Sequence, residues 1–218
     1  MSAVPSRSGY ITLEEYYRLE ETSMIRHDYV GGRRVPVGCD PATYDPSNPD
    51  ALLMAGGSPE HSLVIANIVR EIGNGLKGKP CRVYDSNLRI GSADGFRHFP
   101  DATIVCGPLA IDPTDPTGHT IRNPTVAIEV LSPSTAGYDL GDKFDHYRAI
   151  ETFREYVVVR QDRAEITTYL RHDDGSWTFR AFTGLAAEVP IRSVDITLAM
   201  SEVYDGIDFP PPPPFVAG

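Results

Sequence analysis

The sequence is poor in cysteine and in positive charge, and each shortage excludes a class of protein. Its 218 residues include three cysteines, at positions 39, 81 and 106. They are too few and too far apart for a disulfide framework or a CxxC zinc motif, so we expect three ordinary buried thiols and a reducing, cytoplasmic compartment. Twenty Lys and Arg against 30 Asp and Glu give a net charge of -10. This excludes a histone-like or ribosomal binder of polyanions, although one positive face on an acidic body can still hold a phosphate backbone.

Long apolar runs are also missing. No segment approaches the roughly 18 continuous apolar residues that a membrane span requires, and the opening MSAVPSRSGY lacks the apolar core of a signal peptide. We therefore expect no membrane partner. Hydrophobic residues still make up 41% of the chain, enough to fill a core without help from disulfides or metals. We expect one domain over residues 10–206 and a disordered, proline-rich tail over 207–218.

Capping signals predict where two helices begin. Thr12 opens a capping-box pattern and predicts a helix over residues 12–20. Ser58 is typical of an N-cap and Pro59 of the first helical position. The apolar residues that follow recur at helical spacing until Gly78, which predicts the main helix of the protein.

The remaining elements alternate between strands, hairpins and one more helix. We expect strands over residues 81–84, 88–90, 101–106, 125–131 and 156–159, hairpins over 27–37 and 163–182, and a helix over 139–150. Loops rich in Pro, Gly and Asp are expected over 38–49 and 107–124. This order predicts an α/β (α+β) fold with a mixed central sheet flanked by helices and with added β-hairpins.

Two carboxylates interrupt apolar strands. Glu129 has apolar neighbours on both sides in TVAIEVL, where a carboxylate loses much of its hydration. Asp101 follows Pro100 at the start of another apolar run. If the two strands are neighbours, their side chains converge, because adjacent strands lie roughly 4.8 Å apart. A divalent cation removes the repulsion between two such carboxylates, and Mg²⁺ suits a site of one or two carboxylates. Each residue alone also has a structural explanation, an ion pair for Glu129 and a turn for Asp101.

Lys143 and His61 are the basic candidates. Lys143 lies on the helix that follows the Glu129 strand, where an ammonium group orients a water or stabilises charge on a phosphate. From spacing alone, a salt bridge to Asp139 or a solvated surface position is the favoured explanation of Lys143. His61 lies in the first turn of the main helix, within reach of a cleft. The other five histidines show no metal-ligand spacing and are taken as ordinary.

Several short motifs together resemble the Uma-two family of restriction endonucleases. They are RHDYVGG (26–32), GSPEH (57–61), NI (67–68), PCRVY (80–84), PD (100–101), IEVLSPST (128–135), YD (138–139), Lys143 and REYV (154–157). The run EVLSPST is the most specific of them. The resemblance covers residues 10–206 and implies the PD-(D/E)XK nuclease-like superfamily. The resemblance also implies a restriction endonuclease-like fold and a magnesium-dependent endonuclease that acts on phosphodiester bonds of nucleic acid. DNA rather than RNA is the expected substrate.

The resemblance also implies the roles of individual residues. Asp101 and Glu129 would bind Mg²⁺, for which Mn²⁺ can substitute, and the backbone carbonyl of Val130 would be a further ligand. Lys143 would assist catalysis, and His61 completes the candidate set. An enzyme that cuts both strands of a duplex gains from two sites, so a homodimer is expected.

Two alternatives remain open. The superfamily's usual lysine lies two residues after the acidic residue, but this chain has Leu131 there. Lys143 must then supply the charge from the next helix. If it does not, the chain is a nuclease-like fold that acts as a non-catalytic nucleic-acid-binding or structural module. A sugar hydrolase with two carboxylates is the weakest alternative, because no aromatic platform accompanies either carboxylate.

Two further segments have expected positions. Residues 70–99 hold six basic and three acidic side chains and lead into the Asp101 strand, where a phosphate backbone would have to lie; solvated ends of strands and turns are the open alternative for these charges. Residues 38–50 look like an insertion, which we expect to form a surface loop or a cap on one edge of the site.

Overall fold

A six-stranded mixed sheet lies at the centre of the computed structural model, which describes residues 9–48, 57–93, 95–132 and 135–209. In spatial order its strands are β11 (Trp177–Thr183), β10 (Glu165–Arg171), β9 (Glu155–Arg160), β8 (Val126–Leu131), β6 (Ala102–Cys106) and β3 (Cys81–Asp85). β8 and β9 are parallel, and all other neighbours in this sheet are antiparallel. The predicted mixed central sheet is confirmed.

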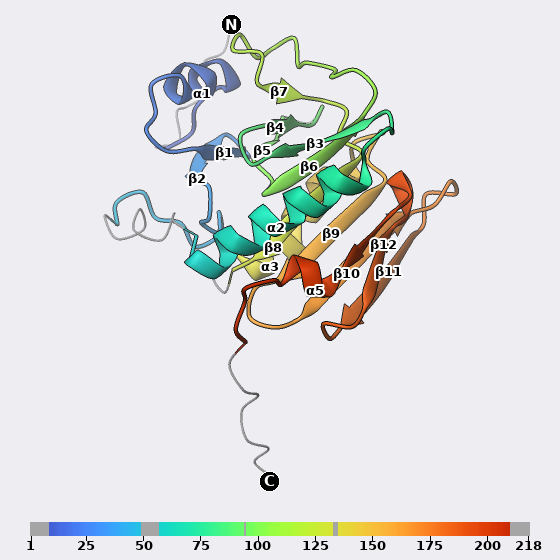
Figure 1. Cartoon of the computed structure of the whole chain (residues 1–218). Helices are drawn as coiled ribbons and strands as arrows, with labels where there is room; N and C mark the ends of the chain where they lie inside the picture. The colour runs from blue at the N-terminus through green and yellow to red at the C-terminus, as the bar shows by residue number, and fades with distance from the viewer. Residues whose placement is uncertain (1–8, 49–56, 94, 133–134, 210–218) are drawn as a thin grey trace, which may run out of the picture.

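Apolar clusters lie on both faces of this sheet, and Figure 1 shows α2 (Pro59–Gly75) and α5 (Met200–Val203) crossing one of them. The elements on that face are α2, α5 and the hairpin of β12 (Glu188–Ile191) and β13 (Ile196–Ala199), whose β12–β13 connection includes a 3₁₀ helix (Arg192–Val194). There Ile68 of α2 packs in one cluster with Ile128 and Val130 of β8. On the other face Tyr147 of α4 (Asp142–Arg148) packs in a cluster with Ala127. Because β8 is buried on both faces, its sequence is almost entirely apolar.

A second sheet of five short strands adjoins the first. Its strands are β2 (Arg33–Pro36), β1 (His27–Val30), β5 (Arg97–His98), β4 (Arg89–Gly91) and β7 (Thr120–Ile121), and α1 (Leu13–Glu20) lies beside it (Figure 1). β5 and β7 fall where the sequence predicts no strand. Each is two residues long, which is too short to show an alternating pattern.

The capping and turn signals of the sequence are confirmed. The side chains of Thr12 and Ser58 each accept a hydrogen bond from the backbone amide three residues later, at 3.1 and 3.2 Å. Gly31 and Gly32, between β1 and β2, have φ of +55° and +84°, a conformation that favours glycine at a hairpin turn. α2 ends at Gly75, three residues before its predicted end.

The helix predicted over residues 139–150 is two shorter helices. α3 (Ala136–Leu140) and α4 are separated at Gly141, whose φ of -111° and ψ of -107° are not helical. A Cβ atom at this position would lie 3.1 Å from the carbonyl oxygen of Gly137, a tight contact with backbone that favours glycine at the break. No helix in the described part of the chain is long and apolar enough to cross a membrane.

The ordered chain continues slightly beyond the predicted domain end at residue 206. Ile207 and Phe209 pack against the core, and the Phe209 ring contacts Tyr204 with 5.2 Å between ring centroids. The predicted disorder therefore does not apply to these residues. Residues 210–218 lie outside the described part of the chain.

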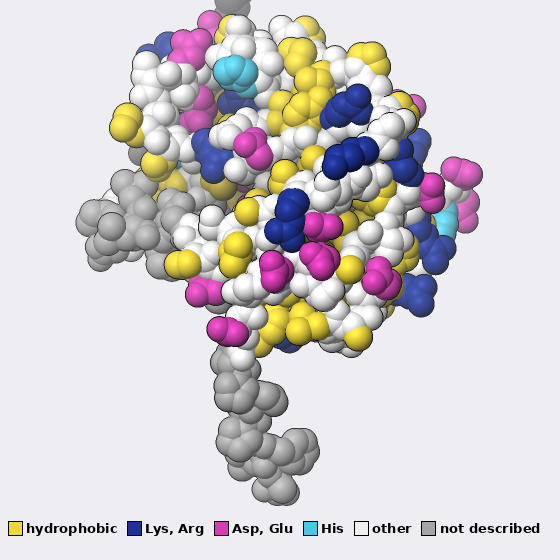
Figure 2. All heavy atoms as spheres, viewed as in Figure 1, with side chains coloured by type: hydrophobic (Ala, Val, Ile, Leu, Met, Phe, Trp, Pro, Cys, Tyr) yellow, Lys and Arg dark blue, Asp and Glu magenta, His cyan; other side chains and the backbone are white. Residues whose placement is uncertain are grey.

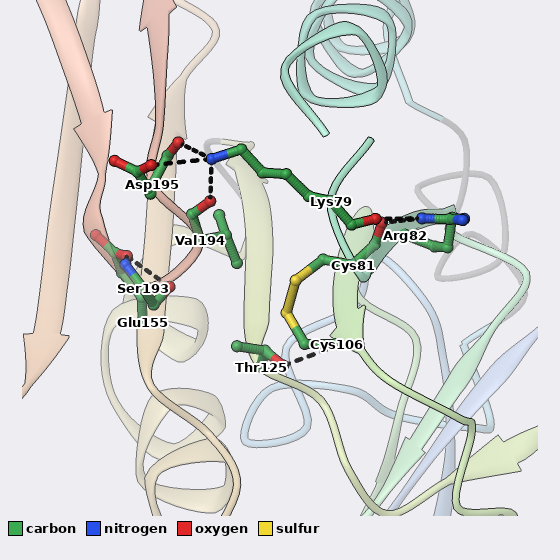
Figure 3. The surroundings of a disulfide bond; sticks show 9 residues. All are labelled: Lys79, Cys81, Arg82, Cys106, Thr125, Glu155, Ser193, Val194 and Asp195. Carbon is green, nitrogen blue, oxygen red and sulfur yellow. Dashed lines mark hydrogen bonds and ion pairs between the residues drawn. A yellow bond between two sulfur atoms is a disulfide. The ribbon is translucent and has the colours of Figure 1, made fainter. Parts of the chain in front are cut away.

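Cys81 and Cys106 form a disulfide bond, which corrects the prediction of three separate thiols (Figure 3). The antiparallel register of β3 and β6 pairs these two residues directly, although 25 positions separate them in sequence. Register depends on tertiary structure, so cysteine spacing alone does not reveal this bond. The inference of a reducing compartment loses its support from cysteine, and the cytoplasm stays a prediction.

Candidate active site

A cavity of about 380 Å³ lies where α2 begins, between β1, the end of β8 and the helices α3 and α4. All five predicted site residues line it: His61, Asp101, Glu129, Val130 and Lys143. The structure therefore brings the predicted site residues together, while their chemical roles stay predictions.

The register of β6 and β8 explains how the two carboxylates meet. These antiparallel strands pair Ala102 with Ile128, so the next pair in the same register is Asp101 with Glu129. Oδ2 of Asp101 accepts a hydrogen bond of 2.7 Å from the backbone amide of Val130. The Asp101 side chain is 18% exposed and that of Glu129 is 4% exposed, so one lies at the mouth and the other deep inside.

Lys143 reaches into the cavity from α4. Its Nζ lies 2.8 Å from Oε1 of Glu129 and 3.3 Å from Oδ1 of Asp139. The hydroxyl of Tyr147, one turn further along α4, donates to the same Glu129 oxygen at 2.9 Å. Lys143 therefore forms the salt bridge to Asp139 that was one alternative, but it is buried and also contacts Glu129. Leu131, at the position of the superfamily's usual lysine, is buried in the apolar cluster instead.

The cavity holds more negative than positive charge. Four carboxylates line it, those of Asp28, Asp101, Glu129 and Asp139, around one buried ammonium group. Burial raises the pKa of Glu129 well above its ordinary value, and only the positive charge of Lys143 strongly opposes this shift. Burial disfavours the charge on Lys143, yet the neighbouring carboxylates, Glu129 first, raise the pKa of the ammonium group well above its ordinary value. Lys143 therefore stays protonated.

His61 lies between two hydrogen-bond acceptors. Its Nε2 is 3.4 Å from Oδ1 of Asp101, and its Nδ1 is 3.2 Å from Oε1 of Gln161. Burial alone would lower the pKa of His61, but Asp101 and Gln161 together raise it above its ordinary value. With an acceptor at each nitrogen, the doubly protonated imidazolium form is favoured. Gln161, just after β9, is a site residue that sequence reasoning missed.

A buried chain of hydrogen bonds also begins at the cavity. Asp28 of β1 lines it, and its Oδ1 accepts the backbone amide of Phe99 at 3.0 Å. Its Oδ2 lies 3.1 Å from Nδ1 of His98, and Nε2 of His98 lies 2.8 Å from Nδ1 of His146. Burial would raise the pKa of Asp28, but His98 lowers it below its ordinary value. These histidines, taken as ordinary from the sequence, thus connect to the cavity; Asp28 lies in the RHDYVGG motif, whose own spacing gave no sign of a site.

Ser86 and Phe99 of the segment over residues 70–99 line the cavity, but none of the segment's basic side chains does. Arg89 and Arg97 are 3% and 1% exposed and pair with aspartates in the loop after β6. Lys77 lies beyond the far end of α2, roughly 20 Å from His61 at 1.5 Å per residue. Figure 2 shows Lys and Arg side chains mixed with Asp and Glu on the face that carries α2. At the cavity itself the exposed cation is Arg26.

One end of the predicted insertion does border the cavity. Gly38 and Cys39 line it together with Val37. Of the two predicted roles for residues 38–50, a cap on one edge therefore fits this end of the segment. Residues 49 and 50 lie outside the described part of the chain.

The ligand set for a metal ion is small. Among the described residues no group of three or more His, Cys, Asp or Glu side chains is arranged to hold a metal ion. Asp101 and Glu129 are thus a two-carboxylate set, and any further ligands must come from the backbone, water or substrate.

The fold has a match among solved structures. A crystal structure described as "a putative nuclease belonging to DUF820 from Anabaena variabilis" has the same fold, with a TM-score of 0.66 and 16% identity, over 89% of this chain and 97% of that one. Two Synechocystis proteins described as uncharacterized are also similar. One is 28% identical over 90% of this chain and 92% of its own length, and the other is 26% identical over 88% and 99%.

Family membership follows from the match along the chain. The Uma-two family, described as "Putative restriction endonuclease", matches residues 13–201, and this chain belongs to it. The resemblance seen in the short motifs is confirmed, and at a coarse level the family supports a nuclease.

Proposed function

We propose that the protein is a magnesium-dependent endonuclease that hydrolyses phosphodiester bonds of DNA at this cavity. The register that sets Asp101 beside Glu129, with Lys143 in contact with Glu129, is the observation that carries the proposal. Membership of a restriction endonuclease family supports the reaction class.

The residues present fit a magnesium ion. Mg²⁺ in phosphoryl-transfer sites uses one or two carboxylates and completes its shell with water and phosphate oxygens. Asp101 and Glu129 provide that number, and no three His, Cys, Asp or Glu side chains of the described chain are grouped as an all-protein cage. A divalent cation also offsets the excess of carboxylates. The Val130 carbonyl is a further ligand in this proposal, and Mn²⁺ should replace Mg²⁺.

When bound, the metal would supply charge neutralisation at the scissile phosphate and a water of lowered pKa. The chain's own groups position the reactants. The Val130 amide holds Asp101, and Lys143 and Tyr147 hold Glu129. The ammonium group of Lys143 stabilises negative charge as it develops. His61 holds a proton at Nε2 at the mouth of the cavity, where it can donate to the leaving oxygen.

A cleavage assay tests the proposal. Purified protein should cut supercoiled plasmid and linear duplex DNA in Mg²⁺ or Mn²⁺ and not in EDTA. Asp101→Asn and Glu129→Gln should each lower the rate by about 100-fold or more, as removal of a group that stabilises transition-state charge does. Glu188→Gln, on the exposed surface of β12, is the matched control and should cut like the parent. Equal cutting by all four proteins would contradict the assigned site.

A non-catalytic module is the second candidate, favoured by one contact. Lys143 already neutralises Glu129, so the cavity is stable as an ion pair without a cation. Calorimetry distinguishes the enzyme from the module. An enzyme should bind Mn²⁺, and Asp101→Asn and Glu129→Gln should each abolish that binding, whereas a module should show no such binding. Sedimentation with duplex DNA tests the proposed homodimer, which a monomer at all concentrations would rule out.

A further inference from the structure

One polar group in the cavity has no partner in the protein. The hydroxyl of Tyr138, on α3, is buried and forms no hydrogen bond, and the whole residue is 8% exposed. Tyr138 lines the same cavity as Asp101 and Glu129. Nearly all buried polar groups in proteins are hydrogen-bonded, so a buried hydroxyl without a partner beside a cavity points to a ligand.

Tyr138 differs from the other buried side chains that have an atom without a hydrogen bond. Among the described residues four buried side-chain atoms lack a hydrogen bond, the others being on His27, Glu155 and Arg160. His27 and Arg160 have ion-pair partners for the same atoms, and the second carboxylate oxygen of Glu155 accepts two hydrogen bonds. Tyr138 has no second polar atom in its side chain, and it alone of the four lines the cavity.

The hydroxyl groups of two neighbouring tyrosines, unlike that of Tyr138, have hydrogen-bond acceptors within the protein. Tyr147 donates to Glu129 at 2.9 Å, and Tyr156 donates to the carbonyl oxygen of Asp139 at 2.9 Å. The carboxylates near Tyr138 have other partners in the protein: Asp28 contacts His98 and the Phe99 amide, and Glu129 and Asp139 contact Lys143. The Tyr138 hydroxyl therefore keeps an unused donor in a residue that lines the cavity, although the oxygen itself is closed to solvent in this structure.

The hydroxyl can act only as a hydrogen-bond donor. Burial, with the nearby carboxylates Asp28, Asp139 and Glu129, raises the pKa of Tyr138 far above its ordinary value, so the proton stays on the phenol. The cations that accompany it at this cavity are Lys143, His61 and Arg26. A donor set of this kind suits the oxygens of a phosphate group.

We propose that Tyr138 is a further catalytic residue, whose hydroxyl donates a hydrogen bond to a non-bridging oxygen of the scissile phosphate. This inference rests on the proposed nuclease function. The phosphate completes the hydrogen bonding of Tyr138, and the donor opposes the negative charge that grows on phosphate oxygens during the reaction. Tyr138 adds no metal ligand and moves no proton.

The Tyr138→Phe variant tests this role through two measurements, its unfolding temperature and its rate of DNA cleavage. A purely structural role of the hydroxyl would lower both together. The substitution removes a buried hydroxyl that has no partner, so the variant should unfold at the same temperature as the parent or higher. Its DNA cleavage should nevertheless fall by roughly 100-fold in kcat. Tyr29→Phe is the matched control, because the Tyr29 hydroxyl donates to the Ile11 carbonyl away from the cavity. That variant should lose some stability and keep its kcat. A Tyr138→Phe protein that cuts like the parent, or whose loss of activity follows its unfolded fraction, would overturn the proposal.

A second measurement identifies the acceptor. The cleavage position in one duplex is mapped, and that phosphate is replaced by each phosphorothioate diastereomer. Sulfur accepts hydrogen bonds weakly, so the penalty of Tyr138→Phe should nearly vanish on one diastereomer and persist on the other. Equal penalties on both would mean that Tyr138 donates to something else, such as a bound water, and would overturn the phosphate assignment.

Failure of the proposed function remains distinguishable from failure of this inference. If the parent cuts no DNA in Mg²⁺, the nuclease proposal fails, and Tyr138 is tested by the binding of inorganic phosphate, followed by calorimetry in Mg²⁺. Weaker phosphate binding by Tyr138→Phe than by the parent and Tyr29→Phe would still support the hydroxyl as an anion donor. Equal binding, or none by any of the three, would overturn it.

Discussion

The protein buries charge in two regions, and only one of them is balanced. In the arginine–aspartate cluster, formed by Arg89, Arg97, Asp112 and Asp115, each guanidinium has its own carboxylate at 3.1 and 2.8 Å. In the cavity, four carboxylates surround the single buried ammonium group of Lys143, which contacts two of them, Glu129 and Asp139. The first region satisfies its charges without help, whereas the second has room for a cation and an anion from outside.

Two successive Asp-Pro-Thr repeats, residues 112–114 and 115–117, build the balanced region. In each repeat Oδ1 of the aspartate accepts both the amide and the hydroxyl of the threonine, while Oδ2 faces an arginine. Burial alone would raise the pKa of Asp115, but hydrogen bonds from Thr117 and Thr120 and the charge of Arg89 lower it to about 2. The pKa of Glu129 moves in the opposite direction. The donors and charges around a buried carboxylate thus decide whether its pKa falls or rises.

Removal of the Asp115 charge is expected to have the largest effect on stability. Asp115→Asn leaves Arg89 buried without a counter-charge, which should cost about 3–5 kcal/mol in the free energy of unfolding, measured in urea. Asp45→Asn is the control, because Asp45 forms the same kind of turn on the surface. Cleavage per folded molecule should not change. A loss no greater than that of the control would mean that the cluster is not what stabilises this region.

Removal of the disulfide should lower the stability of the protein without changing any charge in either region. The bond closes a loop of 25 residues in separation, for which the chain-entropy model gives about 3 kcal/mol. A protein with both Cys81→Ser and Cys106→Ser should lose stability of this size and retain the kcat of the parent. Cys39→Ser, outside the disulfide, is the control. Equal unfolding free energies for the double variant and the control would contradict the bond.

Replacement of Lys143 by a neutral residue increases the excess of negative charge in the cavity. Lys143→Met should lower cleavage by about 100-fold, because the ammonium group no longer opposes charge in the transition state. It should also tighten Mn²⁺ binding, measured by calorimetry, by about tenfold, since a competitor for Glu129 is gone. Lys77→Met, on the surface beyond α2, should change neither quantity. Unchanged Mn²⁺ affinity in Lys143→Met would place the cation elsewhere.

Among these predictions, the loss of stability that acidic pH causes through the arginine–aspartate cluster should be the smallest effect. The folded pKa of Asp115 lies near 2, below the ordinary aspartate value, so its contribution is complete above about pH 4 and is lost as the pH falls toward 2. The unfolding free energy of the parent should fall across that window more steeply than that of Asp115→Asn. Parallel curves would show that this carboxylate titrates at its ordinary pKa.

Local signals in the sequence predicted much of the fold. Thr12, Ser58 and the pair Gly31-Gly32 determine caps and a turn through contacts within a few residues, so their effects can be read from the chain. The two-residue strands β5 and β7 could not be predicted, because they exist only through pairing with distant segments. The Cys81–Cys106 bond was missed for the same reason.

The candidate site was predictable where a residue violates a local pattern. Glu129 stands out as a charge within a strand buried on both faces, and Asp101 by its place after a proline. Asp28, Tyr138 and Gln161 violate no such pattern, and they reach the cavity only through the packing of β1, α3 and the end of β9. The family resemblance, not spacing, linked Lys143 to Glu129.

The most direct test of the account is the position of manganese in crystals of the parent soaked with MnCl₂, located by anomalous scattering. The account predicts a peak between the carboxylates of Asp101 and Glu129 that is missing in Asp101→Asn crystals treated in the same way. Crystals that keep Lys143 on Glu129 and show no peak at this position, or an equal peak in the variant, would contradict it.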